Sequence, residues 1–68
     1  MATIYEKVGE NIRKLRKKAE FSQEDLANKA KLDLTSVSEI ESGLRNPSLK
    51  TLHKISLALR IHIAELFE

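Results

Sequence analysis

The stretch 22–43 limits the possible folds of this chain more than any other part of the sequence. It holds two short runs of apolar residues at helical spacing, and each run follows a residue that caps helices. Ser22, with Asp25 three positions later, is typical of a capping box, and Asp33 precedes the second run. Gly43 then provides a helix stop. Two helices this short are not stable alone, so the remaining chain must hold them in place.

The apolar residues of this stretch predict which faces of the two helices point inward. Leu26, Ala27 and Ala30 share one face of the first helix, and Val37 and Ile40 share one face of the second. The outer face of the second helix is polar. Two short helices joined by a tight turn, the second with a polar outer face, form the helix-turn-helix arrangement.

Three further helical patterns surround this pair. Residues 3–19 predict a helix capped by Thr3, residues 48–59 a helix capped by Ser48, and residues 62–67 a last short helix. The residues expected to face the core in these helices are Ile4, Val8, Ile12, Leu15, Ala19, Leu49, Leu52, Ile55, Ser56, Leu59, Ile63, Leu66 and Phe67. No segment alternates as a strand does, so we expect an all-α, compact bundle of five short helices.

Length and composition exclude several functional classes. Residues 1–68 suffice for a single small domain, which without cysteine has no disulfide and no thiolate metal site. Neither a signal-peptide pattern nor a membrane-spanning apolar run is present, so the protein is expected to be cytoplasmic. His53 and His62 lack the spacing of a metal site and the context of a catalytic triad, so we expect no enzyme activity, no metal and no cofactor.

The placement of the charges is more informative than the net charge of +2. Basic residues crowd the end of the first helix, whereas residues 33–42 carry three acidic side chains and no basic one. A basic surface is compatible with nucleic-acid binding, but compensation of the helix dipole and solubility explain the cluster equally well. Charge alone leaves both interpretations open.

Four blocks of residues resemble the lambda-repressor/Cro family of helix-turn-helix DNA-binding domains. The blocks are Arg13-x-x-Arg16, Ser22-Gln23-Glu24-x-Leu26-Ala27, Val37-Ser38-x-Ile40-Glu41-x-Gly43 and Arg45-Asn46-Pro47-Ser48-Leu49-x-Thr51-Leu52. The resemblance covers nearly the whole chain. It implies a homodimeric transcription regulator that binds a double-stranded DNA operator and inserts the helix at about 34–42 into the major groove of two half-sites. No small-molecule effector is expected.

The resemblance also implies roles for individual residues. The positions that match base-contacting sites are Leu34, Thr35, Ser36 and Glu39. Those that match DNA-backbone contacts are Ser22, Gln23, Ser42, Arg45 and Asn46, with Arg16, Lys31 and Lys50 as further candidates. In the family, the glutamate at the position of Glu41 pairs with the arginine at the position of Arg16, which implies a structural ion pair. Dimers of the family form through the carboxyl-terminal region, here Ile55, Leu59, Ile61, Ile63, Leu66 and Phe67, although these residues could equally fill the core of one monomer.

Several positions depart from the family pattern. Lys31 and Arg60 stand where the family usually has a turn glycine. Apart from the family pattern, Gly9 within the first helix indicates a close helix crossing. The helix at 34–42 offers few hydrogen-bond donors, which weakens the expectation of strong base readout. An antitoxin or protein-interaction module on the same fold is therefore the alternative. Within the family, the sequence looks like the controller proteins of restriction–modification systems, and small phage repressors are also similar.

Overall fold

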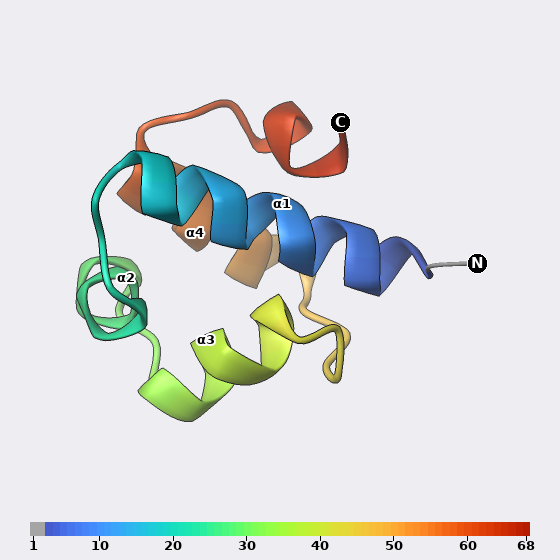
Figure 1. Ribbon diagram of the computed structural model, residues 1–68, viewed down its shortest axis with the longest axis horizontal. Coiled ribbons are helices and arrows are strands. Elements are labelled where there is room, and N and C mark those ends of the chain that lie inside the picture. Colours follow the sequence, from blue (N-terminus) through green and yellow to red (C-terminus); the bar gives the residue numbers. More distant parts are fainter. Residues whose placement is uncertain (1–2) are drawn as a thin grey trace.

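The computed structural model describes residues 3–68, so the first two residues of the predicted domain lie outside the description. These residues form an all-α bundle, as expected, and the last of the five helices is a 3₁₀ helix (Figure 1). The elements are α1 (Ile4–Lys18), α2 (Gln23–Ala30), α3 (Leu34–Glu41), α4 (Leu49–Leu59) and the 3₁₀ helix η1 (Ile63–Phe67).

The amino ends of the four α-helices are fixed by the caps that the sequence predicts. Thr3, Ser22, Asp33 and Ser48 each accept a hydrogen bond from the backbone N–H three residues further along the chain. At the first two caps, an acidic side chain in turn accepts a hydrogen bond from the backbone N–H of the cap residue, which completes a capping box. Local chemistry therefore sets where each α-helix begins.

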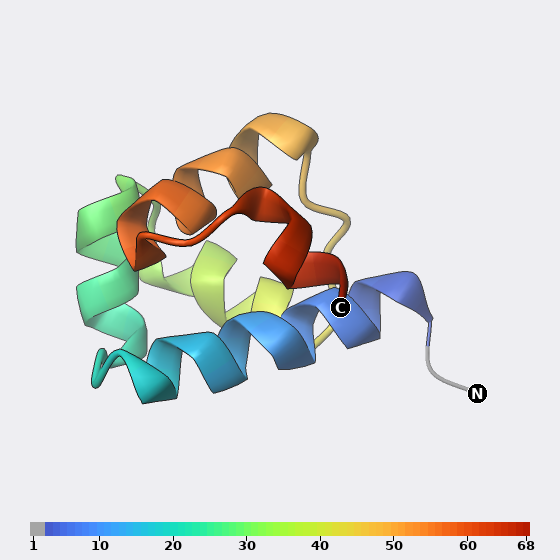
Figure 2. The same cartoon turned by 90° about the horizontal axis from the view of Figure 1, so that it is seen from above.

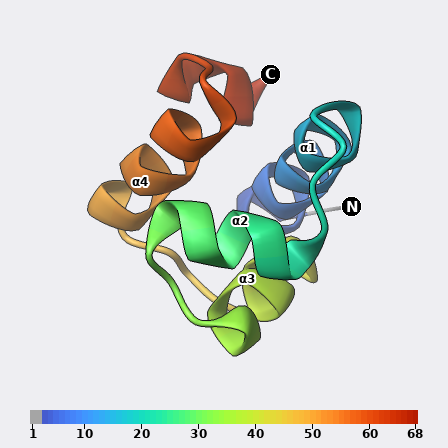
Figure 3. The same ribbon diagram turned by 90° about the vertical axis from the view of Figure 1, so that its left-hand side faces the viewer.

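The helices surround one apolar core. Helix α1 packs against α3 and η1, α2 packs against α3 and α4, and η1 also packs against α4 (Figure 2). In Figure 3, α2 lies above α3 and between α1 and α4. The buried apolar residues are Val8, Ile12, Leu26, Ala27, Ala30, Val37, Ile40, Leu52, Ile55, Leu59 and Leu66. All five apolar residues predicted to face inward within 22–43 belong to this set, and Ser56 is buried beside it.

Four of the predicted inward residues are exposed, and those predictions were wrong. Ile4 is 60% exposed, Leu49 is 70% exposed and Phe67 is 46% exposed, while Ala19 is also exposed. All four lie at helix ends, where the apolar stripe continues past the elements that would cover it. The first turn of α1 projects beyond the other helices, for example (Figure 1).

Gly9 lies where α1 crosses α3, as the sequence predicts. A Cβ atom at this position would overlap the carbonyl oxygen of Ile40 and would lie 2.8 Å from the carbonyl oxygen of Glu41. The absence of a side chain therefore lets the two helices approach backbone to backbone. This contact helps to set the angle of α3.

All four α-helices end in the same left-handed turn, but only one has glycine there. The turn residues are Glu20, Lys31, Gly43 and Arg60, with φ values of 63°, 58°, 76° and 57°. After each one, the next residue donates its backbone N–H to the carbonyl five residues back, over 2.8–3.0 Å, as in a Schellman motif. Lys31 and Arg60, which stand where the family usually has glycine, therefore adopt a backbone conformation that glycine favours. Glu20 adopts it as well, and nothing in the sequence had indicated this.

Arg60→Gly is expected to raise the free energy of unfolding by about 0.5–1 kcal/mol, because glycine adopts the left-handed conformation without the backbone strain of arginine. The greater flexibility that glycine gives the unfolded chain offsets part of this gain. Urea denaturation of both proteins measures this change. Arg60→Ala is the matched control, because it removes the same charge and keeps the Cβ atom. Equal stability of the glycine and alanine variants would contradict the assignment of strain to this position.

Candidate nucleic-acid interface

The exposed side of α3 is the best-defined candidate surface. Val37 and Ile40 turn inward to the core, while Thr35 is exposed and Leu34 is 47% exposed at the start of the helix. Ser36 and Glu39, on the same outer side, are half-buried. The four residues expected to contact bases therefore lie on the side of α3 that faces away from the core.

A buried ion pair fixes α3 against α1. Arg16 Nε lies 2.6 Å from Glu41 Oε2, and Nη2 donates to Oε1 over 3.1 Å, so the pair is bidentate. Arg16 Nη1 also donates to the carbonyl oxygen of Phe21 over 2.7 Å. Both charged side chains are less than a tenth exposed, so the structure has the ion pair that the family resemblance implies. Because Arg16 is buried, its additional candidacy as a phosphate contact was wrong.

The side chain of Gln23 points into the protein. Its amide nitrogen donates to Glu41 Oε1 over 3.1 Å, which joins the start of α2 to the same carboxylate. The resemblance implied that this amide reaches a phosphate, whereas the structure has it bonded within the protein. The Glu41 carboxylate thus connects α1, α2 and α3.

Arg45, in the segment between α3 and α4, folds back over the outer side of α3. Its Nη1 donates to Ser36 Oγ and its Nη2 to Glu39 Oε1, each over 2.6 Å. The resemblance grouped Arg45 with the phosphate contacts. The structure instead brings it together with two of the four residues expected to contact bases.

The other residues expected to contact the DNA backbone are all exposed. They are Ser22, Lys31, Ser42, Asn46 and Lys50. Two of their hydroxyl groups already have partners, since Ser22 caps α2 and Ser42 Oγ donates to the Ser38 carbonyl over 2.9 Å. The lysines and Asn46 carry the polar groups with the greatest freedom to meet a phosphate.

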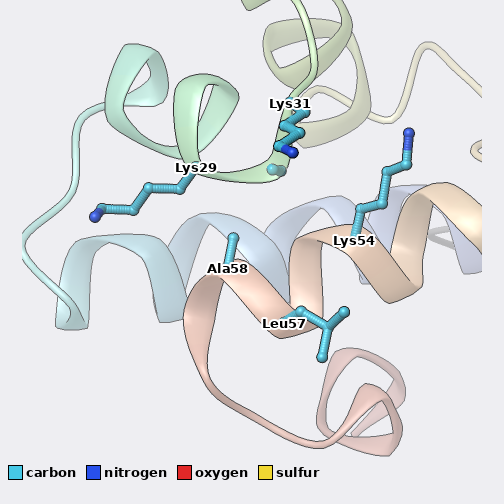
Figure 4. A pocket seen from close by; sticks show the side chains of 6 residues that line it. Lys29, Lys31, Lys54, Leu57 and Ala58 are labelled. Atoms are coloured by element: carbon cyan, nitrogen blue, oxygen red, sulfur yellow. The ribbon is translucent and has the colours of Figure 1, made fainter.

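A shallow basic pocket lies between α2 and α4 (Figure 4). Lys29, Lys31 and Lys54 stand around it, and Leu57 and Ala58 form part of its apolar lining. Spacing along the chain did not indicate this grouping, because Lys54 belongs to α4 and only tertiary packing brings it beside Lys29 and Lys31 at the end of α2.

An acidic side chain lies at the amino end of each helix of the pair, namely Asp25 in the first turn of α2 and Asp33 at the cap of α3. Hydrogen bonds from the Ser36 side chain and backbone hold the pKa of Asp33 below its usual value. The backbone and side chain of Ser22 likewise lower the pKa of Asp25. Both carboxylates therefore stay ionised at neutral pH and complement the positive amino ends of the two helices.

The structure contradicts half of the predicted dimer interface. Ile55 and Leu66 are fully buried in the core of the monomer, and Leu59 is 7% exposed. Ile61 and Ile63 are partly buried against that core, whereas Phe67 is exposed. The core positions predicted from helical spacing are therefore correct for Ile55, Leu59 and Leu66, and the dimer role implied by the family resemblance does not hold for them.

The apolar surface that remains on this side differs from the predicted one. Leu49, Lys50, His53 and Ile63 line a pocket where α4 meets the start of η1. Leu49 was expected in the core, so the sequence did not identify it as an interface residue. Its position in the first turn of α4, after a proline-containing segment, was the available signal.

Residues 3–68 contain neither a metal-binding cluster nor a membrane-spanning helix. No three histidine, aspartate or glutamate side chains gather there in a way that could hold a metal ion. No helix in that part of the chain is long and apolar enough to cross a membrane.

Comparisons with known proteins agree with this geometry. Residues 12–66 match the helix-turn-helix family model. The control protein C.MunI from a Mycoplasma species is 47% identical over 68 residues, which cover 98% of this chain and 92% of that protein. The immunity repressor protein of Bacillus phage phi105 is 39% identical over 57 residues, covering 84% and 40%. The crystal structure of the restriction-modification controller protein C.AhdI from Aeromonas hydrophila superimposes with a TM-score of 0.91 at 41% identity, covering 93% and 96%.

Proposed function

This chain belongs to the helix-turn-helix family of DNA-binding transcription regulators, and on that premise we propose that it acts as a homodimer whose two α3 helices enter the major groove of two half-sites. The proposal rests on how α3 is held. The buried Arg16–Glu41 pair fixes this helix in place, while its outer side stays exposed. A helix fits a major groove about 12 Å wide with its first residues at the base edges.

Two sets of contacts follow from this placement. The exposed polar and basic residues beside α3, above all Lys31, Asn46 and Lys50, contact phosphates and supply most of the affinity. On α3 itself, Leu34 meets a thymine methyl group and Thr35 meets a base edge. The carboxylate of Asp33, which caps α3, disfavours a phosphate at the amino end of this helix and so favours the approach of bases there.

The dimer contact is proposed on the α4–η1 surface, defined as Leu49, His53, Ile63 and Phe67. Leu49 and Phe67 are large apolar side chains that are 70% and 46% exposed, and Leu49, His53 and Ile63 line one pocket. An exposed apolar surface of this kind suits a two-fold contact, in which each copy offers the same residues. Two copies joined there would read half-sites about 34 Å apart, one turn of the duplex.

The regulated genes are proposed to be those of a restriction–modification system. The support is the higher identity to the controller proteins, 47% for C.MunI and 41% for C.AhdI, than to the phage immunity repressor, at 39%. A small phage-type repressor is the second candidate. The operator decides between them, because a controller's binding site must lie upstream of restriction or modification genes.

The proposal predicts salt-dependent binding of two chains to one duplex. Operators are first selected from a random pool of duplexes, and affinity is then measured by fluorescence anisotropy over a range of salt concentrations. The logarithm of the affinity is expected to fall with the logarithm of the salt concentration with a slope of several units, because each phosphate contact releases counterions. Sedimentation of the same complex is expected to give two chains for each duplex.

Two results would contradict this proposal. Absence of binding to any duplex at low salt would favour the protein-interaction alternative. A single chain on each duplex, with a monomer in free solution at micromolar concentration, would remove the homodimer. Leu49→Glu tests the homodimer separately from DNA binding. Because Leu49 is exposed, the variant should stay folded while it loses the dimer and binds DNA more weakly.

A further inference from the structure

We propose that Arg45, a residue outside α3, supplies the main base-reading donor of this protein and selects a guanine in the major groove. Ser36 and Glu39 act as positioning residues that hold its guanidinium over α3. This inference rests on the proposed placement of α3 in the groove. It concerns which residue reads the bases, and the family resemblance grouped Arg45 with the phosphate contacts.

The position of the guanidinium is defined by two short hydrogen bonds. Nη1 donates to Ser36 Oγ and Nη2 to Glu39 Oε1, each over 2.6 Å, and the two acceptors are three residues apart on one side of α3. The Arg45 and Glu39 side chains remain 45% and 40% exposed. The guanidinium therefore lies on the outer side of α3 and is still open to a ligand.

The donors of α3 are too few for a guanine. The major-groove edge of guanine presents two acceptors, O6 and N7, and a guanidinium matches both at once. On the outer side of α3, Leu34 has no polar group, Glu39 only accepts, and Thr35 has one hydroxyl. Arg45 carries more N–H groups than its contacts with Ser36 and Glu39 use, so it can keep these contacts and donate to a base.

Glu39 favours a base contact over a phosphate contact for Arg45. A phosphate would compete with the Glu39 carboxylate for the same guanidinium, and would leave that carboxylate unpaired in a strongly negative groove. A base edge is uncharged, so the pair stays intact while the remaining donors of Arg45 reach O6 and N7. The pairing also explains how an acidic residue can lie on a helix that approaches DNA.

The test measures base preference separately from affinity. The selected operator and all of its single-base-pair variants are titrated with the wild type, Arg45→Ala, Arg45→Lys and Lys50→Ala. Arg45→Ala is expected to lose discrimination of about 5- to 150-fold at one G·C pair and to keep its preference elsewhere. Arg45→Lys keeps the charge and the salt slope but loses most of that discrimination, because an ammonium lacks the planar fork.

Lys50→Ala is the matched control, because Lys50 is an exposed basic residue proposed to meet a phosphate. It is expected to weaken binding to every duplex by the same factor and to reduce the salt slope by about one unit. Glu39→Gln should change two quantities in opposite directions. Removal of its charge strengthens binding to unrelated duplexes, while the looser guanidinium lowers the preference for the same G·C pair.

The inference is overturned if Arg45→Ala behaves like Lys50→Ala, weakening all duplexes equally with a smaller salt slope, or if it leaves base preference unchanged. Failure of the proposed function gives a different result, since the wild type itself would then bind no duplex. Circular dichroism of each variant shows that the fold is intact, which is expected because exposed ion pairs contribute little to stability.

Discussion

Arg16→Met is expected to lower the free energy of unfolding by about 3–5 kcal/mol, because it leaves the Glu41 carboxylate buried without its charged partner. Small domains have only about 5–15 kcal/mol in total, so this variant is expected to be partly unfolded at 37 °C. It also removes the donor to the Phe21 carbonyl, which loosens the segment between α1 and α2. Urea denaturation followed by circular dichroism measures the loss.

A second variant shows whether the cause is the unpaired charge. Arg16→Met combined with Glu41→Leu removes both members of the pair, and most of the lost stability is expected to return, since apolar pairs of similar volume often replace buried ion pairs without loss. Lys14→Ala is the control, because it breaks an exposed pair with Glu10 and should leave stability unchanged. If the double variant is as unstable as Arg16→Met alone, the packing of the arginine stem outweighs the charge.

Gly9→Ala is expected to lower the free energy of unfolding by about 1–3 kcal/mol, although alanine is normally the better helix former. The added Cβ atom would meet the carbonyl oxygens of Ile40 and Glu41, and these backbone atoms cannot move away without moving α3. The variant should therefore lose DNA affinity together with stability. Denaturant unfolding and anisotropy titrations on the selected operator measure the two effects.

Lys7→Ala is the control for this position, because Lys7 is exposed in the same part of α1. It is expected to leave the angle of α3 unchanged. A more stable Gly9→Ala protein would show that α1 and α3 separate easily, and the close crossing would then not determine the position of α3.

The sequence allowed the prediction of the parts of the fold that depend on neighbouring residues. Caps act over three positions, so Ser22 and Asp33 marked the starts of α2 and α3. The left-handed turn at Lys31 was indicated by the resemblance, since the family usually has a turn glycine at this position. The apolar faces of the central helices were also correct, because helical spacing is itself a local property.

The predictions were wrong where the partner of a residue lies far away in the chain. Helical spacing placed Ile4 and Leu49 in the core, but no other element covers those helix ends. The family resemblance offered Ile55 and Leu66 as part of a dimer surface, whereas both are fully buried within the monomer, as their helical spacing had predicted. An apolar stripe has the same spacing whether it meets its own chain, a second copy or solvent.

For the candidate interface, residue patterns were enough to predict the type of helix pair, its boundaries and the polar side of α3. The directions of the Gln23 and Arg45 side chains became known only from the folded chain, because each side chain is held by a residue that is distant in sequence or across a turn. A side chain with several donors satisfies them with whichever acceptors the fold brings near. Those acceptors are Glu41 and Glu39, whose positions depend on how α3 packs against α1 and α2.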